Sequence, residues 1–178
     1  ITIKHRIGVD SNDTFSNLNS FVRDISLAGA ERFIVHARKA LLNGLSPKEN
    51  RIIPPLRYDI VEKLKEKNPD LLIEINGGFN NIKECLNGLQ KFDGVMVGRS
   101  AYKHPMRWAN VDERIYGAKS KSLKVSTIIA NLIPYIEKHL ENGGNCWHIC
   151  KHIINLIEGI PKAKILRNNI CSNSTADK

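Results

Sequence analysis

The sequence lacks several patterns that would each point to a class of protein. It has no run of about 18 apolar residues, so we expect no membrane-spanning helix. No secretory signal peptide is visible. The four cysteines, Cys85, Cys146, Cys150 and Cys171, lack the paired CxxC spacing of zinc sites. We therefore predict no metal, free thiols in a reducing compartment and a cytoplasmic location, with an organelle as the alternative.

Two further absences concern the start of the chain. No GxGxxG turn follows the first predicted strand, which weakens the case for a dinucleotide-binding Rossmann fold. There is also no initiator methionine, and the sequence begins inside a predicted strand. We therefore expect the chain to be the C-terminal part of a longer protein.

What the chain does have is an excess of positive charge. It holds 27 Lys and Arg against 18 Asp and Glu, a net charge of +9. Residues 1–117 carry 18 basic and 14 acidic side chains, and residues 118–178 carry 9 and 4, so the C-terminal part is more basic per residue. This balance favours an anionic partner such as nucleic acid.

Strand and helix patterns alternate over residues 1–99. Strands are predicted at 1–8, 32–37, 70–78 and 93–99, and helices at 15–28, 58–67 and 81–89, with Thr14 capping the first helix and Gly29 ending it. This alternation is typical of βα units and a parallel sheet, either open or closed into a barrel.

The pattern changes after Tyr102, where no further strand is predicted. Helices are predicted at 123–140, 147–157 and 162–170, and Pro134 is expected to kink or restart the first of them. We place a domain boundary near Tyr116 and expect a disordered tail at 173–178.

Polar side chains and glycines gather where the predicted strands end. The carboxyl ends of parallel strands meet at one face, which holds the active site in such folds. Backbone amides of Asn-Gly-Gly and Gly-Arg turns can approach a phosphate, although each turn alone fits a purely structural role equally well. We expect Lys4 to point inward among apolar neighbours, where it needs an anion. The candidates are Lys4, His36, Asn76, Gly77, Gly78, Gly98 and Arg99.

Five segments carry a resemblance to a known family. KHRIG, HARKALLNGLSPKENRIIPPL, INGG and DGVMVGRSAY resemble the A-type branch of the tRNA-dihydrouridine synthases. GIPKAKILRNNI resembles the end of that family's helical tRNA-binding domain, so the resemblance covers the chain to about Ser172.

The resemblance implies a fold and an activity. Residues 1–116 would be strands five to eight of a TIM (β/α)8 FMN-binding barrel, and residues 117–172 a small all-α helical bundle that binds tRNA. The parent protein would be an oxidoreductase that reduces D-loop uridines of tRNA to dihydrouridine with FMN and NADPH. We expect a monomer.

The resemblance also implies site residues. The strand-end candidates above match the family's FMN ligands. Lys48 and Arg51 match tRNA-contacting positions of the long loop, with solvated loop charge as the lesser alternative. Lys164, where arginine is usual, and Arg167 match a basic pair in the helical domain. The predicted tRNA-binding set is Arg38, Lys39, Lys48, Arg51, Lys164 and Arg167.

The proton donor that the resemblance implies is missing. In this family a cysteine in the first half of the barrel, within an Asn-x-Gly-Cys-Pro-like loop, protonates C5 of the uracil. None of the four cysteines has that context, so we assign no catalytic residue and expect the chain alone to be inactive and to bind FMN weakly or not at all. The alternatives are a flavin barrel acting on a small molecule and a non-catalytic RNA-binding remnant. Retention of the flavin-side candidates argues against the remnant.

Overall fold

The computed structural model describes residues 1–119 and 123–175. The chain divides into two compact units, Ile1–Gly98 and Arg99–Lys178. The sequence predicts a boundary near Tyr116 instead. Residues 99–116 form short helices that group with the second unit, and α5 ends at Tyr116 with Gly117 in a left-handed conformation.

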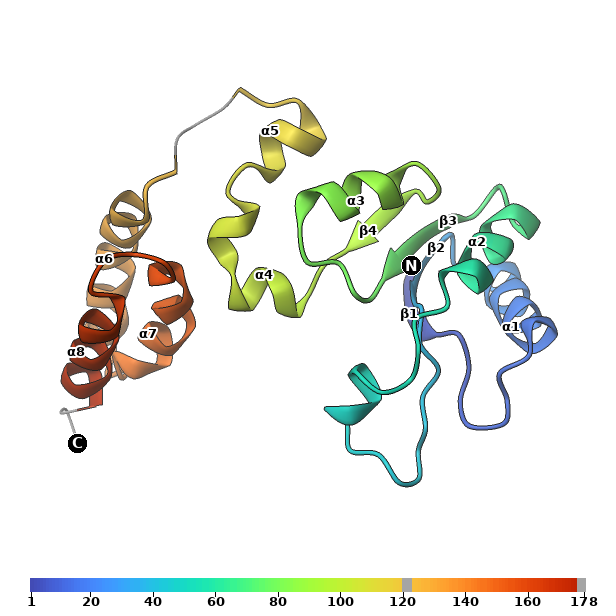
Figure 1. Ribbon diagram of the computed structural model, residues 1–178, viewed down its shortest axis with the longest axis horizontal. Helices are drawn as coiled ribbons and strands as arrows, with labels where there is room; N and C mark the ends of the chain where they lie inside the picture. The colour runs from blue at the N-terminus through green and yellow to red at the C-terminus, as the bar shows by residue number, and fades with distance from the viewer. Residues whose placement is uncertain (120–122, 176–178) are drawn as a thin grey trace. The chain divides into compact units, whose positions relative to one another are not determined.

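The first unit is a parallel four-stranded sheet with helical crossovers (Figure 1). Its elements are β1 (Thr2–Arg6), α1 (Phe15–Leu27), β2 (Arg32–His36), the 3-10 turn η1 (Glu49–Arg51), α2 (Tyr58–Lys67), β3 (Leu72–Asn76), α3 (Ile82–Leu89) and β4 (Gly94–Met96). The strands pair in chain order, β1-β2-β3-β4. The βα alternation predicted from the sequence is therefore confirmed, with strands a few residues shorter than expected.

Local signals place the helices as predicted. Thr14 caps α1 by accepting a hydrogen bond from the Asn17 amide at 3.2 Å, and Asn81 caps α3 by accepting one from the Glu84 amide at 2.9 Å. Gly29 follows the end of α1 with φ +98°, a conformation that costs a residue with a Cβ about 1–2 kcal/mol. These caps fix where each crossover helix begins and ends.

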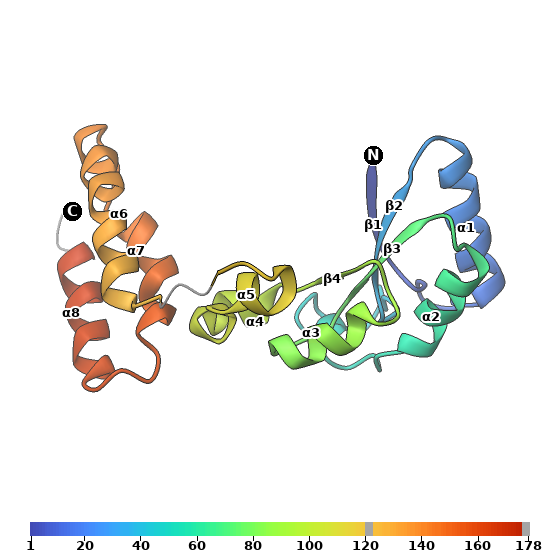
Figure 2. The same cartoon turned by 90° about the horizontal axis from the view of Figure 1, so that it is seen from above.

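The core lies between the sheet and the helices. Phe33 and Val35 of β2 are completely buried, together with Ile73 and Ile75 of β3. They pack in one cluster with residues of α1 and α2, such as Val22. Figure 2 shows α1 and α2 on the same side of the strands. Since side chains alternate along a strand, the residues between these core positions face the other side of the sheet.

The regular elements in the described part of the second unit are helices and 3-10 turns. They are α4 (Arg99–Lys103), the 3-10 turn η2 (Pro105–Trp108), α5 (Val111–Tyr116), α6 (Val125–Glu141), α7 (Trp147–Ile153), the 3-10 turn η3 (Ile154–Ile157) and α8 (Ala163–Thr175). α7 packs against both η3 and α8. Among the residues described, no helix combines the length and apolar character that a membrane crossing requires.

Some predictions for the second unit need correction. Pro134 does not restart a helix, because α6 runs without a break through it. The predicted helix at 147–157 is α7 followed by a 3-10 turn. α8 continues past the predicted end at Ile170 to Thr175, so residues 173–175 of the predicted disordered tail are helical and the rest of that tail lies outside the described residues.

Candidate functional site

The sheet face opposite the helices carries aligned polar side chains. In the strand register Lys4 stands beside Ile34 and Ile34 beside Glu74, while Arg6 stands beside His36 and His36 beside Asn76. Paired residues of parallel strands point to the same side, so these form two rows across one face. The structure thus brings Lys4, His36 and Asn76 to one side of the sheet.

The environment of Lys4 differs from the prediction. The sequence predicts an inward lysine among apolar neighbours, but Lys4 is exposed. Its neighbours on β1 face the helices: Ile3 packs on the core, and the His5 ring makes edge contacts with Phe21 and Phe33 at 5.2 and 6.1 Å. Burial lowers the pKa of His5 from its ordinary value. Lys4 lies on the other face, which no helix of the described first unit covers, and so it is open to a ligand.

The turn after β3 requires glycine at both positions. Gly77 and Gly78 have φ values of +113° and +85°. A Cβ on Gly77 would lie 3.1 Å from the His36 ring, and one on Gly78 would lie 2.7 Å from the Tyr58 hydroxyl oxygen. The Tyr58 hydroxyl donates to the Gly77 carbonyl at 2.6 Å. The turn is therefore a tight backbone cradle with the predicted His36 side chain against it.

Asn76 has a partner that the sequence does not reveal. Its Nδ2 donates to the Met96 carbonyl at 2.7 Å and thereby ties β3 to β4. One of its amide hydrogens is thus used within the sheet, while Oδ1 accepts no hydrogen bond from the residues that the structure describes. Asn76 has a structural role whether or not it also contacts a ligand.

The Gly-Arg sequence does not end a strand. β4 stops at Met96, and Arg99 is the first residue of α4 in the second unit. Gly98 has no positive φ, and a Cβ there would meet no atom within 4 Å. The strand prediction over 93–99 fails here because the apolar run is short. The expected roles of Gly98 and Arg99 in phosphate binding stay predictions.

The long loop between β2 and α2 is an ordered segment. Asn50 holds it through two hydrogen bonds of 2.7 Å, accepting from the Leu41 amide and donating to the Leu41 carbonyl. Ser46 and Glu49 form a capping box, with the Ser46 amide donating to Glu49 Oε2 at 2.8 Å. The loop that carries the predicted RNA contacts is thus preformed.

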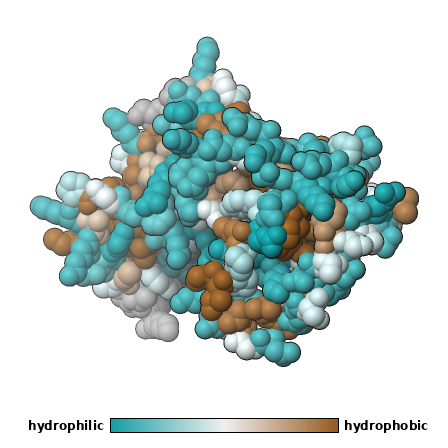
Figure 3. Space-filling model, turned by 45° about the vertical axis from the view of Figure 1, so that its right-hand side comes forward, coloured by the Kyte–Doolittle hydropathy of each residue, from teal (hydrophilic) through white to brown (hydrophobic). Residues whose placement is uncertain are grey.

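The predicted RNA-contacting side chains of this loop have different environments. Arg38 donates from Nε to the Pro54 carbonyl at 2.7 Å, and Arg51 from Nε to the Pro47 carbonyl at 2.8 Å. Lys39 pairs with Asp13 at 2.8 Å. Lys48 is exposed. The loop also carries exposed apolar side chains, Leu42, Ile52 and Ile53, and Figure 3 shows hydrophobic side chains among a mostly hydrophilic surface.

Arg6 contacts this loop, although it is not among the site residues predicted from the sequence. Its guanidinium donates to the carbonyls of Lys39 and Asn50, each at 2.9 Å, and so joins both ends of the loop. Burial, followed by the charges of Arg38 and Arg51, lowers the pKa of Arg6 from its ordinary value. Arg6 could have been predicted from its position two residues after Lys4, because residues i and i+2 of a strand lie on the same face.

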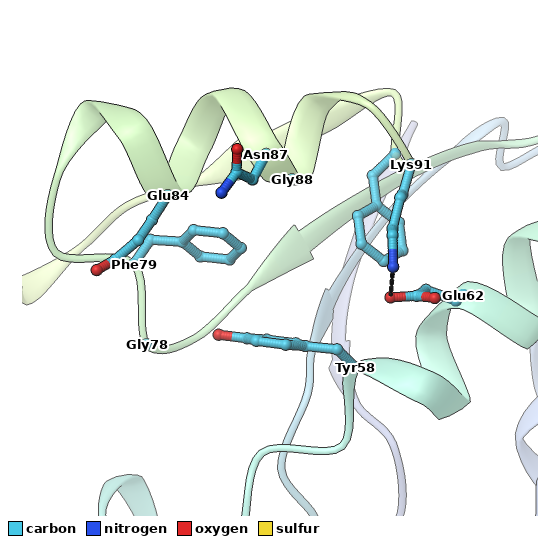
Figure 4. A pocket seen from close by; sticks show the side chains of 9 residues that line it. Tyr58, Glu62, Gly78, Phe79, Glu84, Asn87, Gly88 and Lys91 are labelled. Carbon is cyan, nitrogen blue, oxygen red and sulfur yellow. Dashed lines mark hydrogen bonds and ion pairs between the residues drawn. The ribbon is translucent and has the colours of Figure 1, made fainter.

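A groove of about 330 Å³ lies on the helix side of the glycine turn, between α2 and α3 (Figure 4). The Tyr58 and Phe79 rings line it with their centroids 5.7 Å apart. At its other end Lys91 pairs with Glu62 at 2.8 Å. Since these charges are already paired with each other, the groove offers mainly apolar wall and is not the predicted site.

The second unit contains the remaining predicted residues. Lys164 and Arg167 both lie on α8, Lys164 exposed and Arg167 half-buried. His104 pairs with Glu158 at 2.6 Å, and the hydrogen bond from His104 lowers the pKa of Glu158. Among the residues described, no group of three or more His, Cys, Asp or Glu side chains could hold a metal ion.

A parallel sheet with helices on one face, aligned polar residues on the other and a glycine turn at its carboxyl edge defines an α/β fold of the kind that binds ligands at the carboxyl ends of its strands. A model of the family described as Dihydrouridine synthase (Dus) matches residues 1–178. The chain belongs to the dihydrouridine synthase family.

Curated relatives agree with this assignment. Proteins named tRNA-dihydrouridine(20/20a) synthase are 47% identical over 167 residues in Pseudomonas putida and 46% identical over 175 residues in Synechocystis sp.. These alignments cover 94% and 98% of this chain but 50% and 52% of the relatives. The chain thus spans about half the length of the curated relatives that it matches.

Proposed function

We propose that this chain is the C-terminal half of a flavin-dependent oxidoreductase that reduces D-loop uridines of tRNA to dihydrouridine. The observation that carries the proposal is identity of 41–47% to proteins named tRNA-dihydrouridine(20/20a) synthase over nearly the whole chain. In this proposal the first unit is half of a TIM barrel, and the helices of the second unit include a tRNA-binding bundle.

The open sheet face fits a bound FMN. Gly77 and Gly78 would bring backbone amides against it, since a Cβ at either position is excluded. Lys4 would place a cation beside its negative charge, and His36 would orient it from beside the turn. Arg99 would pair with its phosphate, next to Gly98, and Asn76 would offer its side-chain oxygen. When reduced by NADPH, FMN would supply the hydride that saturates the C5–C6 bond of a uracil.

In this proposal none of the described thiols provides the proton for C5. Cys85 is buried on α3, and burial raises its pKa to about 11, so it is a poor proton donor to a substrate. The other three cysteines lie in the second unit. We therefore propose that the proton donor comes from a segment other than this chain.

The basic loop and α8 would bind the RNA backbone. Lys48 and Arg51 sit on a loop that Asn50 and Arg6 hold in shape, so their charges reach a phosphate with little loss of conformational freedom. Arg38 and Lys39 lie at the start of the same loop, and Lys164 and Arg167 add charge from the second unit. Phosphate contacts of this kind supply most of the affinity for a folded RNA.

The activity is tested by completing the protein. The part of the Synechocystis relative that this chain does not match is joined to this chain, and the product is incubated with unmodified tRNA, FMN and NADPH. We expect dihydrouridine, detected as nucleosides that are heavier by two hydrogen atoms. The chain alone should give none. A completed protein that binds tRNA but reduces no uridine would favour the RNA-binding remnant, and reduction of a small molecule alone would favour another flavin oxidoreductase.

RNA binding has its own test in the chain itself. The double variant Lys48→Ala, Arg51→Ala should weaken tRNA binding and reduce the slope of log affinity against log salt by about 2, roughly 1 for each lost phosphate contact. The double variant Lys67→Ala, Lys83→Ala removes two exposed lysines, on α2 and α3, and serves as the matched control. An equal loss in this control would show that net charge, and not the loop, determines binding.

A further inference from the structure

Two cysteines in the second unit lie within reach of each other. Cys146 immediately precedes α7 and Cys150 lies one turn along it, and their Sγ atoms are 3.4 Å apart. Neither thiol takes part in the proposed reaction. A third thiol, Cys171 on α8, is close enough for its charge to affect Cys150. The part of the chain that the structure describes offers no three-ligand metal set here, so the pair is not explained as a metal site.

The two thiols differ in access to solvent. Cys150 is only 8% exposed, whereas Cys146 is half-buried. Burial, followed by the hydrogen bond and charge of Cys146, raises the pKa of Cys150 to about 11. Cys150 is therefore protonated at neutral pH, and Cys146 is the sulfur that an oxidant in solution reaches first.

We propose that Cys146 and Cys150 are a site of reversible oxidation to an intrahelical disulfide by a peroxide. The Cys146 thiolate attacks one peroxide oxygen, the O–O bond breaks, and the sulfur becomes a sulfenic acid while hydroxide leaves. The Cys150 sulfur then attacks the Cys146 sulfur, the S–O bond breaks, and water leaves with the thiol proton. Overall two thiols and one hydrogen peroxide give one disulfide and two waters.

Formation of the bond requires a local change in α7. The sulfurs must close from 3.4 Å to about 2.05 Å, and Cβ atoms one helical turn apart, normally about 5–6 Å, must approach about 3.8 Å. The first turn of α7 must therefore tighten. It follows the turn at Gly143 and Gly144, where Gly143 has φ +76° and the Gly144 amide donates to the His139 carbonyl at 2.8 Å. A bond made under such strain is readily reduced again.

Peptide mapping tests the site directly. Trypsin places Cys146 and Cys150 together in residues 139–151, Cys171 in residues 168–178 and Cys85 in residues 84–91. After treatment of the chain with hydrogen peroxide and blocking of the remaining thiols, we expect peptide 139–151 to be lighter by two hydrogen atoms and unblocked. Dithiothreitol should restore both thiols. Cys85 is the internal control and should stay reduced, because it is 2% exposed.

Variants separate the alternatives. Cys171→Ser should leave the disulfide within peptide 139–151 unchanged. Cys146→Ser should abolish that disulfide, and no other disulfide should form in its place. A cross-link between peptides 139–151 and 168–178 would overturn the proposal in favour of a Cys150–Cys171 pair. Blocking of both Cys146 and Cys150 after peroxide treatment, or their conversion to sulfinic acids with no disulfide, would also overturn it.

Discussion

Adding one methyl group at Gly78 should destabilise the first unit far more than the same change at Gly44. Both glycines have nearly the same backbone conformation, with φ values of +85° and +84°. A Cβ on Gly78 would lie 2.6 Å from Leu56 Cδ1 and 2.7 Å from the Tyr58 hydroxyl oxygen, whereas one on Gly44 would meet nothing within 4 Å. The pair therefore separates backbone strain from steric overlap.

The expected magnitudes follow from these two terms. The left-handed conformation costs an alanine about 1–2 kcal/mol, which both variants pay in full. Overlap in a packed site adds about 1–3 kcal/mol, and only Gly78→Ala incurs it. We expect urea unfolding to show a loss of about 1–2 kcal/mol for Gly44→Ala and about 2–5 kcal/mol for Gly78→Ala.

A third variant identifies the overlapping atom. Tyr58→Phe removes the hydroxyl that donates to Gly77 and should cost about 1 kcal/mol by itself. In its background Gly78→Ala should cost less than in the wild type, because the closest polar atom is gone. Gly44→Ala should cost the same in both backgrounds, within about 0.5 kcal/mol. Equal costs for the two glycine variants in the wild type would refute the reasoning.

Three further outcomes are expected. The hydrogen bond from His104 lowers the pKa of Glu158. This bond therefore stabilises the second unit above pH 4.5, the ordinary pKa of a glutamate, and its contribution is lost as the pH falls through the lowered pKa. Thermal unfolding of Glu158→Gln should depend less on pH in that acidic range. Asn50→Ala removes both bonds to Leu41 and should cost about 1–3 kcal/mol locally, seen as faster hydrogen exchange at the Leu41 amide. Thr14→Ala should cost about 1 kcal/mol in thermal unfolding, through the lost cap of α1.

The elements of the first unit could be predicted because local signals agree with tertiary packing. Apolar residues such as Phe33 and Val35 fall in short runs, and Thr14 and Asn81 mark helix starts by side-chain chemistry that acts within three residues. Arg99 escapes such reasoning. Arg99 follows an apolar run and reads as a strand end, but the chain turns into α4 there.

The environments of individual site residues depend on partners distant in the sequence. Arg6 was missed because its contacts, the carbonyls of Lys39 and Asn50, lie 33 and 44 residues away. Lys4 was expected to be buried because its strand neighbours are apolar, whereas its exposure depends on what covers the opposite face of the sheet. That His36 and Asn76 lie side by side at the carboxyl ends of their strands was predictable, since parallel strands end at the same edge of the sheet.

The order of the strands has a consequence for how the chain folds. Each strand pairs with its neighbour in sequence, and the registers join Lys4 to Ile34, Ile34 to Glu74 and Glu74 to Gly94. No described strand therefore has to wait for a distant partner, and the sheet can grow by one βα unit at a time, with a modest loop-closure entropy at each step. β1 is the last strand at one edge of the described sheet, and its outer hydrogen-bonding groups offer a template on which a further strand could be added by the same step.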